Sequence, residues 1–86
     1  MRPLERIDEI SHLIKEIWNE MPGMRYMQLI YVLQSNFSER NYEIGKIEGR
    51  GDGTDSRIGF DLFHIEDEEL KSFLESFLTD LKTNNF

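Results

Sequence analysis

The sequence contains no cysteine, which excludes disulfide bonds, thiolate nucleophiles and zinc sites built from cysteine. It also has no long apolar run, because the longest, residues 29–33, is far shorter than the ~20 residues that a membrane-spanning helix needs. Arg2 and Arg6 are not followed by the apolar stretch of a secretory signal. We therefore expect a cytoplasmic protein without membrane association.

Basic residues are few. Ten Lys and Arg stand against seventeen Asp and Glu, which gives a net charge of −7. Because this charge repels a phosphate backbone and the cations form no stripe, direct nucleic-acid binding is not expected. A chain of 86 residues is long enough for one small domain, residues 1–86, with a thin core. Its hydrophobic content of 38% and aromatic content of 12% indicate a folded chain.

Apolar periodicity predicts three helices, over residues 3–21, 24–37 and 65–82. The first has apolar side chains at intervals of three and four residues and ends at Pro22-Gly23. The second is apolar around most of its circumference, which is typical of a helix surrounded by others. The third has an apolar stripe and an acidic first turn. The predicted fold class is a mainly α single domain of three helices.

The segment between the second and third helices, residues 38–57, is polar and contains four glycines. This composition without a helical period predicts either a long loop or a short β-hairpin. Alternation around Ile58 and Phe60 indicates a strand that could pair with residues 42–47. Because the segment has too few apolar residues to offset its conformational entropy, we expect it to be mobile, above all at residues 49–55.

Two motifs resemble those of a family of small bacterial and phage-borne proteins. The first comprises Trp18, Pro22, Arg25, Tyr26, Gln28, Leu29 and Ile30, and the second comprises Asp61, Phe63, Glu66, Asp67, Glu69 and Leu70. The match covers most of the chain except residues 38–57, which are longer and richer in glycine than the family pattern. His64 stands where that pattern more often has Tyr. The resemblance implies a helical fold and a bacterial or phage origin, but no mechanism, because the family has no established activity.

Catalysis is not expected from the two histidines. His12 lies opposite the apolar stripe of the first helix, as an exposed side chain would. His64 and Glu66 match the His-x-Glu half of a deaminase signature, but the cysteines that would complete its zinc site are absent. Asp61 and His64 have no nearby nucleophile on a strained turn. We expect no catalytic residue, metal or cofactor, and a small hydrolase using His64 is the least favoured function.

A candidate binding set lies at the starts of the second and third helices. Its members are Arg25, Gln28, Asp61, His64, Glu66 and Asp67. The favoured interpretation is structural: Arg25 pairs with one of the acids and fixes the position of the third helix. The alternative is a pocket for a small anion.

Acidic residues are concentrated in the C-terminal third. Residues 61–86 hold seven acids against Lys71 and Lys82. The favoured interpretation is stabilisation of the helix start together with solubility, and the alternative is an acidic face for a basic partner. The sequence therefore favours a non-catalytic protein-binding accessory or regulatory module. An acidic inhibitor that mimics nucleic acid is the alternative function, and the partner in either case is another protein.

Overall fold

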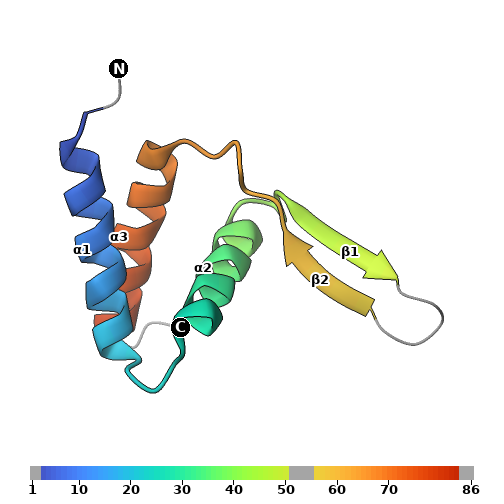
Figure 1. Cartoon of the computed structure of the whole chain (residues 1–86), viewed down its shortest axis with the longest axis horizontal. Helices are drawn as coiled ribbons and strands as arrows, with labels where there is room; N and C mark the ends of the chain where they lie inside the picture. Colours follow the sequence, from blue (N-terminus) through green and yellow to red (C-terminus); the bar gives the residue numbers. More distant parts are fainter. Residues whose placement is uncertain (1–2, 51–55, 84–86) are drawn as a thin grey trace. The chain divides into compact units, whose positions relative to one another are not determined.

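The computed structural model describes residues 3–50 and 56–83 (Figure 1). Its elements, in chain order, are α1 (Glu5–Glu20), α2 (Tyr26–Arg40), β1 (Lys46–Arg50), β2 (Ser56–Phe60) and α3 (Asp67–Thr83). The mainly α fold with three helices is confirmed, and of the two alternatives for the intervening segment the hairpin is correct. The described residues form two compact units, one up to Tyr26 and from Ile65 onward, the other from Met27 to His64.

The first unit consists of α1 and α3, which lie side by side and run parallel (Figure 1). Arg6 of α1 pairs with Asp67 of α3, and Glu9 pairs with Lys71, so residue numbers rise together along both helices. Burial of apolar side chains on the facing stripes closes the unit. Its fully or almost fully buried side chains are Ile17, Phe73, Leu74 and Phe77.

The turn after α1 is held by Trp18. Its indole N–H donates a hydrogen bond to the carbonyl of Met24 at 2.7 Å, and its ring lies 5.4 Å from that of Tyr26. The helix itself ends at Glu20, immediately before the predicted Pro22-Gly23 stop. The indole N–H of Trp18 thus fixes the path of the chain from α1 toward α2.

The second unit consists of α2 and the antiparallel β1–β2 hairpin. Lys46 pairs with Phe60 at one end of the register and Arg50 pairs with Ser56 at the other. The ring of Tyr31 on α2 meets the ring of Phe60 edge to face, with centroids 5.6 Å apart. Two strands are barely stable alone, so this contact with a helix supports the hairpin. The buried residues of α2 are Leu29, Leu33, Phe37 and Ser38.

α2 continues to Arg40, three residues beyond its predicted end. Ser38 explains the extension: its hydroxyl donates to the carbonyl of Ile44 at 2.7 Å, and its own carbonyl accepts the N–H of Glu43 at 2.7 Å. These bonds satisfy polar groups at the helix end that water would otherwise have to solvate. The polar residues after Phe37 therefore complete a helix, although their composition is that of a loop.

Two further predictions for the second unit need correction. The strand paired with β2 is residues 46–50, not 42–47, because Tyr42 and Glu43 both adopt a left-handed backbone with φ of 61°. The prediction that α2 is enclosed is wrong as well. The Met27 side chain is 72% exposed and that of Tyr31 47% exposed, because the buried leucines and Phe37 follow one stripe at intervals of four residues.

The predicted mobile segment, residues 38–57, is largely regular where the structure describes it. It contributes the last turn of α2, a turn and most of the hairpin. Residues 51–55, the greater part of the predicted mobile tip, lie outside the described residues. Within residues 3–50 and 56–83, no helix combines the length and apolar character needed to cross a membrane.

Candidate functional site

The six residues predicted as a binding set are divided between the two units. Arg25, Glu66 and Asp67 belong to the first unit. Gln28, Asp61 and His64 belong to the second.

In the first unit, Arg6 pairs with Asp67 at the start of α3, an ion pair that the sequence did not predict. The Nε atom of Arg6 lies 2.5 Å from Oδ2 of Asp67, and both side chains are partly buried. Arg6 also donates to the carbonyl of Pro3 at 2.8 Å. The parallel packing of α1 and α3 brings residue 6 level with residue 67, a relationship that sequence spacing does not contain. Arg25 lies exposed just before α2.

In the second unit, Asp61 supports the chain reversal after β2. Its N–H donates to the carbonyl of Gly45 at 2.8 Å, and its Oδ1 accepts the N–H of Phe63 at 3.3 Å. His64 is exposed, and its ring meets that of Phe63 edge to face at 5.1 Å. Gln28 is an exposed residue of α2. These positions give Asp61 a structural role.

A pocket that the sequence did not reveal lies between α2 and the hairpin. Its volume is about 280 Å³, and it belongs entirely to the second unit. Tyr31, Ile58 and Phe60 form an apolar wall, and the remainder is polar. The polar lining consists of Ser35, Ser38, Glu39, Glu43 and Lys46.

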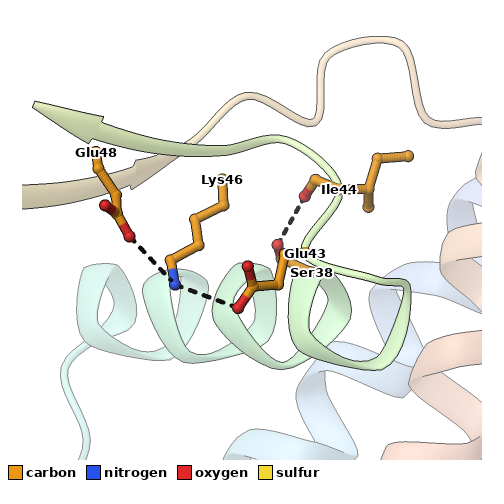
Figure 2. Close-up of polar contacts among 5 residues, drawn as sticks. All are labelled: Ser38, Glu43, Ile44, Lys46 and Glu48. Carbon is orange, nitrogen blue, oxygen red and sulfur yellow. Dashed lines mark hydrogen bonds and ion pairs between the residues drawn. The ribbon is translucent and has the colours of Figure 1, made fainter.

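Lys46 is the only cation among the described residues that line the pocket. Its Nζ lies 3.5 Å from Oε1 of Glu43 and 3.6 Å from Oε1 of Glu48, so the two carboxylates flank the ammonium group (Figure 2). The charge of Glu43 and its hydrogen bond, with a smaller effect of Glu48, raise the pKa of Lys46 above its ordinary value. Glu39 adds a further carboxylate to the lining, so the rim of the pocket is negative.

The turn from α2 to β1 shapes one end of this pocket. Ser38, which lines the pocket, holds the turn through its bond to Ile44 (Figure 2). Gly45 has φ of +72°, and a Cβ there would lie 2.5 Å from the carbonyl oxygen of Asp61. The turn therefore requires glycine at this position, since the chain segments approach too closely for any side chain.

The lining of the pocket has both apolar and polar side chains. It combines an aromatic pair and a branched aliphatic side chain with carboxylates, an ammonium group and hydroxyls. Such a lining accommodates an amphipathic side chain of a partner, apolar along its body and polar at its tip. Within the described residues, His, Asp and Glu form no group of three that could hold a metal ion.

One signal in the sequence did bear on the pocket. Tyr31 lies outside the main apolar arc of α2, which indicates a second contact face on that helix. Ile58 and Phe60 alternate with Gly59 and Asp61, which predicts one apolar face on the strand. The sequence does not show that these two faces meet. Their meeting depends on the register of the hairpin and on the path of the turn, and neither follows from the apolar pattern.

Comparisons of this chain with protein-family models, curated proteins and solved structures found no match.

Proposed function

We propose that this chain is a non-catalytic protein-binding module, an accessory or regulatory factor of bacterial or phage origin that acts in the cytoplasm. The observation that carries the proposal is the pocket between α2 and the hairpin, with its apolar wall of Tyr31, Ile58 and Phe60. Aromatic side chains that remain partly exposed at the edge of a pocket are typical anchors for a partner protein. The expected bacterial or phage origin comes from the two sequence motifs.

The distribution of exposed apolar side chains supports an interaction site in the second unit, where Tyr31 and Ile58 are the two of them that line the pocket. Among the described residues, seven of the ten large apolar side chains that are exposed belong to the second unit. Concentration of exposed apolar surface in one part of a small protein indicates an interaction site. The seven are Met27, Tyr31, Tyr42, Ile44, Ile47, Ile58 and Phe63.

Tyr42 adds an energetic argument. Its side chain is 100% exposed, and its backbone is left-handed, a conformation that costs roughly 1–2 kcal/mol in a residue with a Cβ. A fully exposed ring gives the folded chain no packing energy in return. A residue that keeps a strained backbone without adding to stability is characteristic of binding sites.

Site-specific photo-crosslinking tests the proposal. We place a photoreactive phenylalanine analogue at Tyr31 in one variant and at Met27 in another, and expose each to bacterial lysate. Both positions are exposed on α2, but only Tyr31 lines the pocket. We expect position 31 to give a discrete protein adduct. Added wild-type protein should abolish this adduct by competition, whereas added Tyr31→Ala protein should not. Equal labelling from both positions would contradict the assignment of the pocket.

A second candidate function is inhibition of a nucleic-acid-binding protein through an acidic surface. One observation favours it: because α1 and α3 are parallel, their acidic first turns lie at the same end of the first unit. These turns contain Glu5 and Asp8 in α1, and Asp67, Glu68 and Glu69 in α3. The same acids also stabilise the helix starts, so their placement has a structural reason too.

Salt and charge variants separate the two candidates. Binding through the acidic end weakens steeply as ionic strength rises, whereas binding through the apolar wall of the pocket changes little. Replacing Glu68 and Glu69 by Gln would abolish only the first kind of binding. A matched control replaces Glu20 and Glu75 by Gln, which removes the same charge away from the helix starts. Loss of binding in both double variants would indicate a net-charge effect and support neither surface.

A further inference from the structure

The part of α2 that lines the pocket runs from an aromatic ring to a carboxylate. Its lining residues are Tyr31, Ser35, Ser38 and Glu39. Their spacing puts them on one face of the helix. At the helical rise per residue, Tyr31 and Glu39 are separated by about 12 Å along the helix axis. The lining therefore has an apolar part and an acidic part at different heights along α2.

The hairpin contributes to the lining from one of its faces. In the register of the sheet, Lys46 stands opposite Phe60 and Glu48 stands opposite Ile58. Because alternate residues of a strand point to the same face, Glu48 shares the face of Lys46, which lines the pocket. The ion pair of Lys46 with Glu48 therefore lies beside the apolar side chains of Ile58 and Phe60.

Carboxylates outnumber cations around the pocket. The ammonium group of Lys46 is shared between Glu43, at 3.5 Å, and Glu48, at 3.6 Å (Figure 2). Glu39 adds a third carboxylate, and no described residue forms an ion pair with it. Three carboxylates and one ammonium group leave these four side chains with a net charge of −2. This charge favours a cationic occupant.

The position of Glu39 strengthens the preference for a cation. Glu39 lies in the last turn of α2, which ends at Arg40. A helix C-terminus carries the negative end of the helix dipole and stabilises cations. The net charge of −7 of the whole chain attracts basic partners over a longer range. An anion, in contrast, would have to compete with Glu43 and Glu48 for Lys46.

The aromatic rings indicate which cation fits. Tyr31 and Phe60 meet edge to face in the lining, with centroids 5.6 Å apart. An arginine guanidinium stacks on aromatic rings, forms paired hydrogen bonds with a carboxylate and is more weakly hydrated than a lysine ammonium. The volume of about 280 Å³ is just below the roughly 300–1,000 Å³ typical of small-molecule sites, which favours a single side chain over a cofactor.

We propose that the pocket binds an arginine side chain of the partner protein. The methylene groups of this arginine pack against Tyr31, Ile58 and Phe60. Its guanidinium group binds the carboxylate of Glu39. This inference rests on the proposed function, because it specifies the chemistry of the partner that the pocket receives. One guanidinium contact gives a shallower salt dependence than a surface of several acids, so the salt comparison above still separates the two candidate functions.

Selection from a library of random linear peptides tests the arginine assignment. The displayed library is selected on the immobilised wild-type chain and depleted on Tyr31→Ala protein, so that the retained peptides depend on the pocket. We expect these peptides to share one arginine next to apolar residues. Peptides that depend on Tyr31 but lack arginine would overturn this inference and leave the proposed function intact. A library without any peptide that depends on Tyr31 would contradict both.

Synthetic variants of the tightest-binding peptide measure what the guanidinium contributes. Citrulline in place of the shared arginine keeps the shape of the side chain but removes its charge. By isothermal titration calorimetry, we expect this exchange to weaken binding to the wild-type chain at least about fivefold. Lysine in the same place should weaken binding about threefold, because an ammonium group cannot form the paired hydrogen bonds. Equal affinities of the arginine and lysine peptides would overturn the choice of arginine.

Glu39→Gln connects this effect to the pocket. Glu39 is exposed and glutamine is a good helix former, so we expect the variant to fold. It should bind the arginine peptide at least about threefold more weakly than the wild type, and the citrulline exchange should then have a smaller effect. Glu20→Gln removes the same charge from an exposed position in the first unit and is the matched control. An equal loss of affinity in both variants, or an undiminished citrulline effect in Glu39→Gln, would overturn the proposal.

Discussion

Arg6 and Asp67 are 61 positions apart in the chain, yet the guanidinium Nε and the carboxylate Oδ2 lie 2.5 Å apart. Arg6 lies in the first turns of α1, where a positive charge is unfavourable for the dipole of its own helix. Asp67 begins α3, where a negative charge is favourable. Because the two helices pack in parallel, Arg6 and Asp67 form an ion pair that joins the two helix starts.

A double-mutant cycle measures the strength of that pair. We expect Arg6→Ala to lower the free energy of unfolding by about 1–2 kcal/mol, because a partly buried carboxylate loses its cation. With Asp67→Asn already in place, Arg6→Ala should cost less, with a coupling energy of about 1 kcal/mol. Urea denaturation of the four proteins gives these values. Additive effects would show that the two side chains stabilise the unit separately.

We expect two lysines to make the stability of the fold sensitive to alkaline pH. Hydrogen bonding to Glu9 raises the pKa of Lys71, and the charge of Glu43 raises that of Lys46, both above the ordinary value of 10.5. A raised pKa in the folded state stabilises the fold below the unfolded value, and this contribution is lost as pH rises through the folded value. Thermal unfolding followed from pH 9 upward should show the midpoint falling above about pH 10.5.

Arginine variants provide the control for this alkaline effect. Lys46→Arg combined with Lys71→Arg keeps both positive charges at every pH of the experiment, because a guanidinium does not lose its proton there. We expect the double variant to lose less stability than the wild type above pH 10.5. Identical pH profiles would show that other groups, not these lysines, govern the alkaline transition.

Gly45 and Gly59 offer a matched pair of substitutions at the hairpin. In Gly45→Ala, the new Cβ would lie 2.5 Å from a backbone oxygen at positive φ, so we expect a loss of more than about 2 kcal/mol. In Gly59→Ala, the Cβ meets no heavy atom within 4 Å. We expect this second variant to be unchanged or stabilised by roughly 0.5 kcal/mol. Urea denaturation followed by circular dichroism distinguishes them, and equal stabilities would contradict the close approach at Gly45.

Tyr42 should be replaceable by glycine with a gain in stability. Glycine adopts the left-handed backbone without the steric cost of a Cβ, and the exposed ring contributes no burial. We expect Tyr42→Gly to raise the free energy of unfolding by about 0.5–1 kcal/mol. Tyr42→Ala removes the same ring but keeps the Cβ, and it should leave stability almost unchanged. A gain in the alanine variant would assign the cost to the ring instead of the backbone.

The helices could be predicted because their apolar residues recur with the helical period, and Pro22-Gly23 marks the end of the first. The end of the second could not be predicted, because it depends on hydrogen bonds between Ser38 and the turn that follows. Periodicity describes how one element buries a face. It does not describe a polar side chain that bonds to backbone groups six residues further along the chain.

The candidate site was harder to predict, for a related reason. Arg25 and the acids near the third helix are conspicuous in sequence, but the partner of Asp67 is Arg6, which the parallel packing selects. The pocket is formed by Tyr31 on α2 and by Ile58 and Phe60 on β2. Their proximity depends on the left-handed turn at residues 42–45, and single residues in that turn carry no periodic signal.

The first unit combines the N-terminal and C-terminal parts of the described chain. In the sequence, the residues of the second unit lie between these two parts. This order has a consequence during protein synthesis. When α1 leaves the ribosome, the buried residues of α3, which packs against α1, have not yet been translated. They are Phe73, Leu74 and Phe77. Residues 27–64 can form contacts among themselves during this time. The apolar stripe of α1 still has no packing partner. We therefore expect this stripe to stay uncovered until α3 has been synthesised.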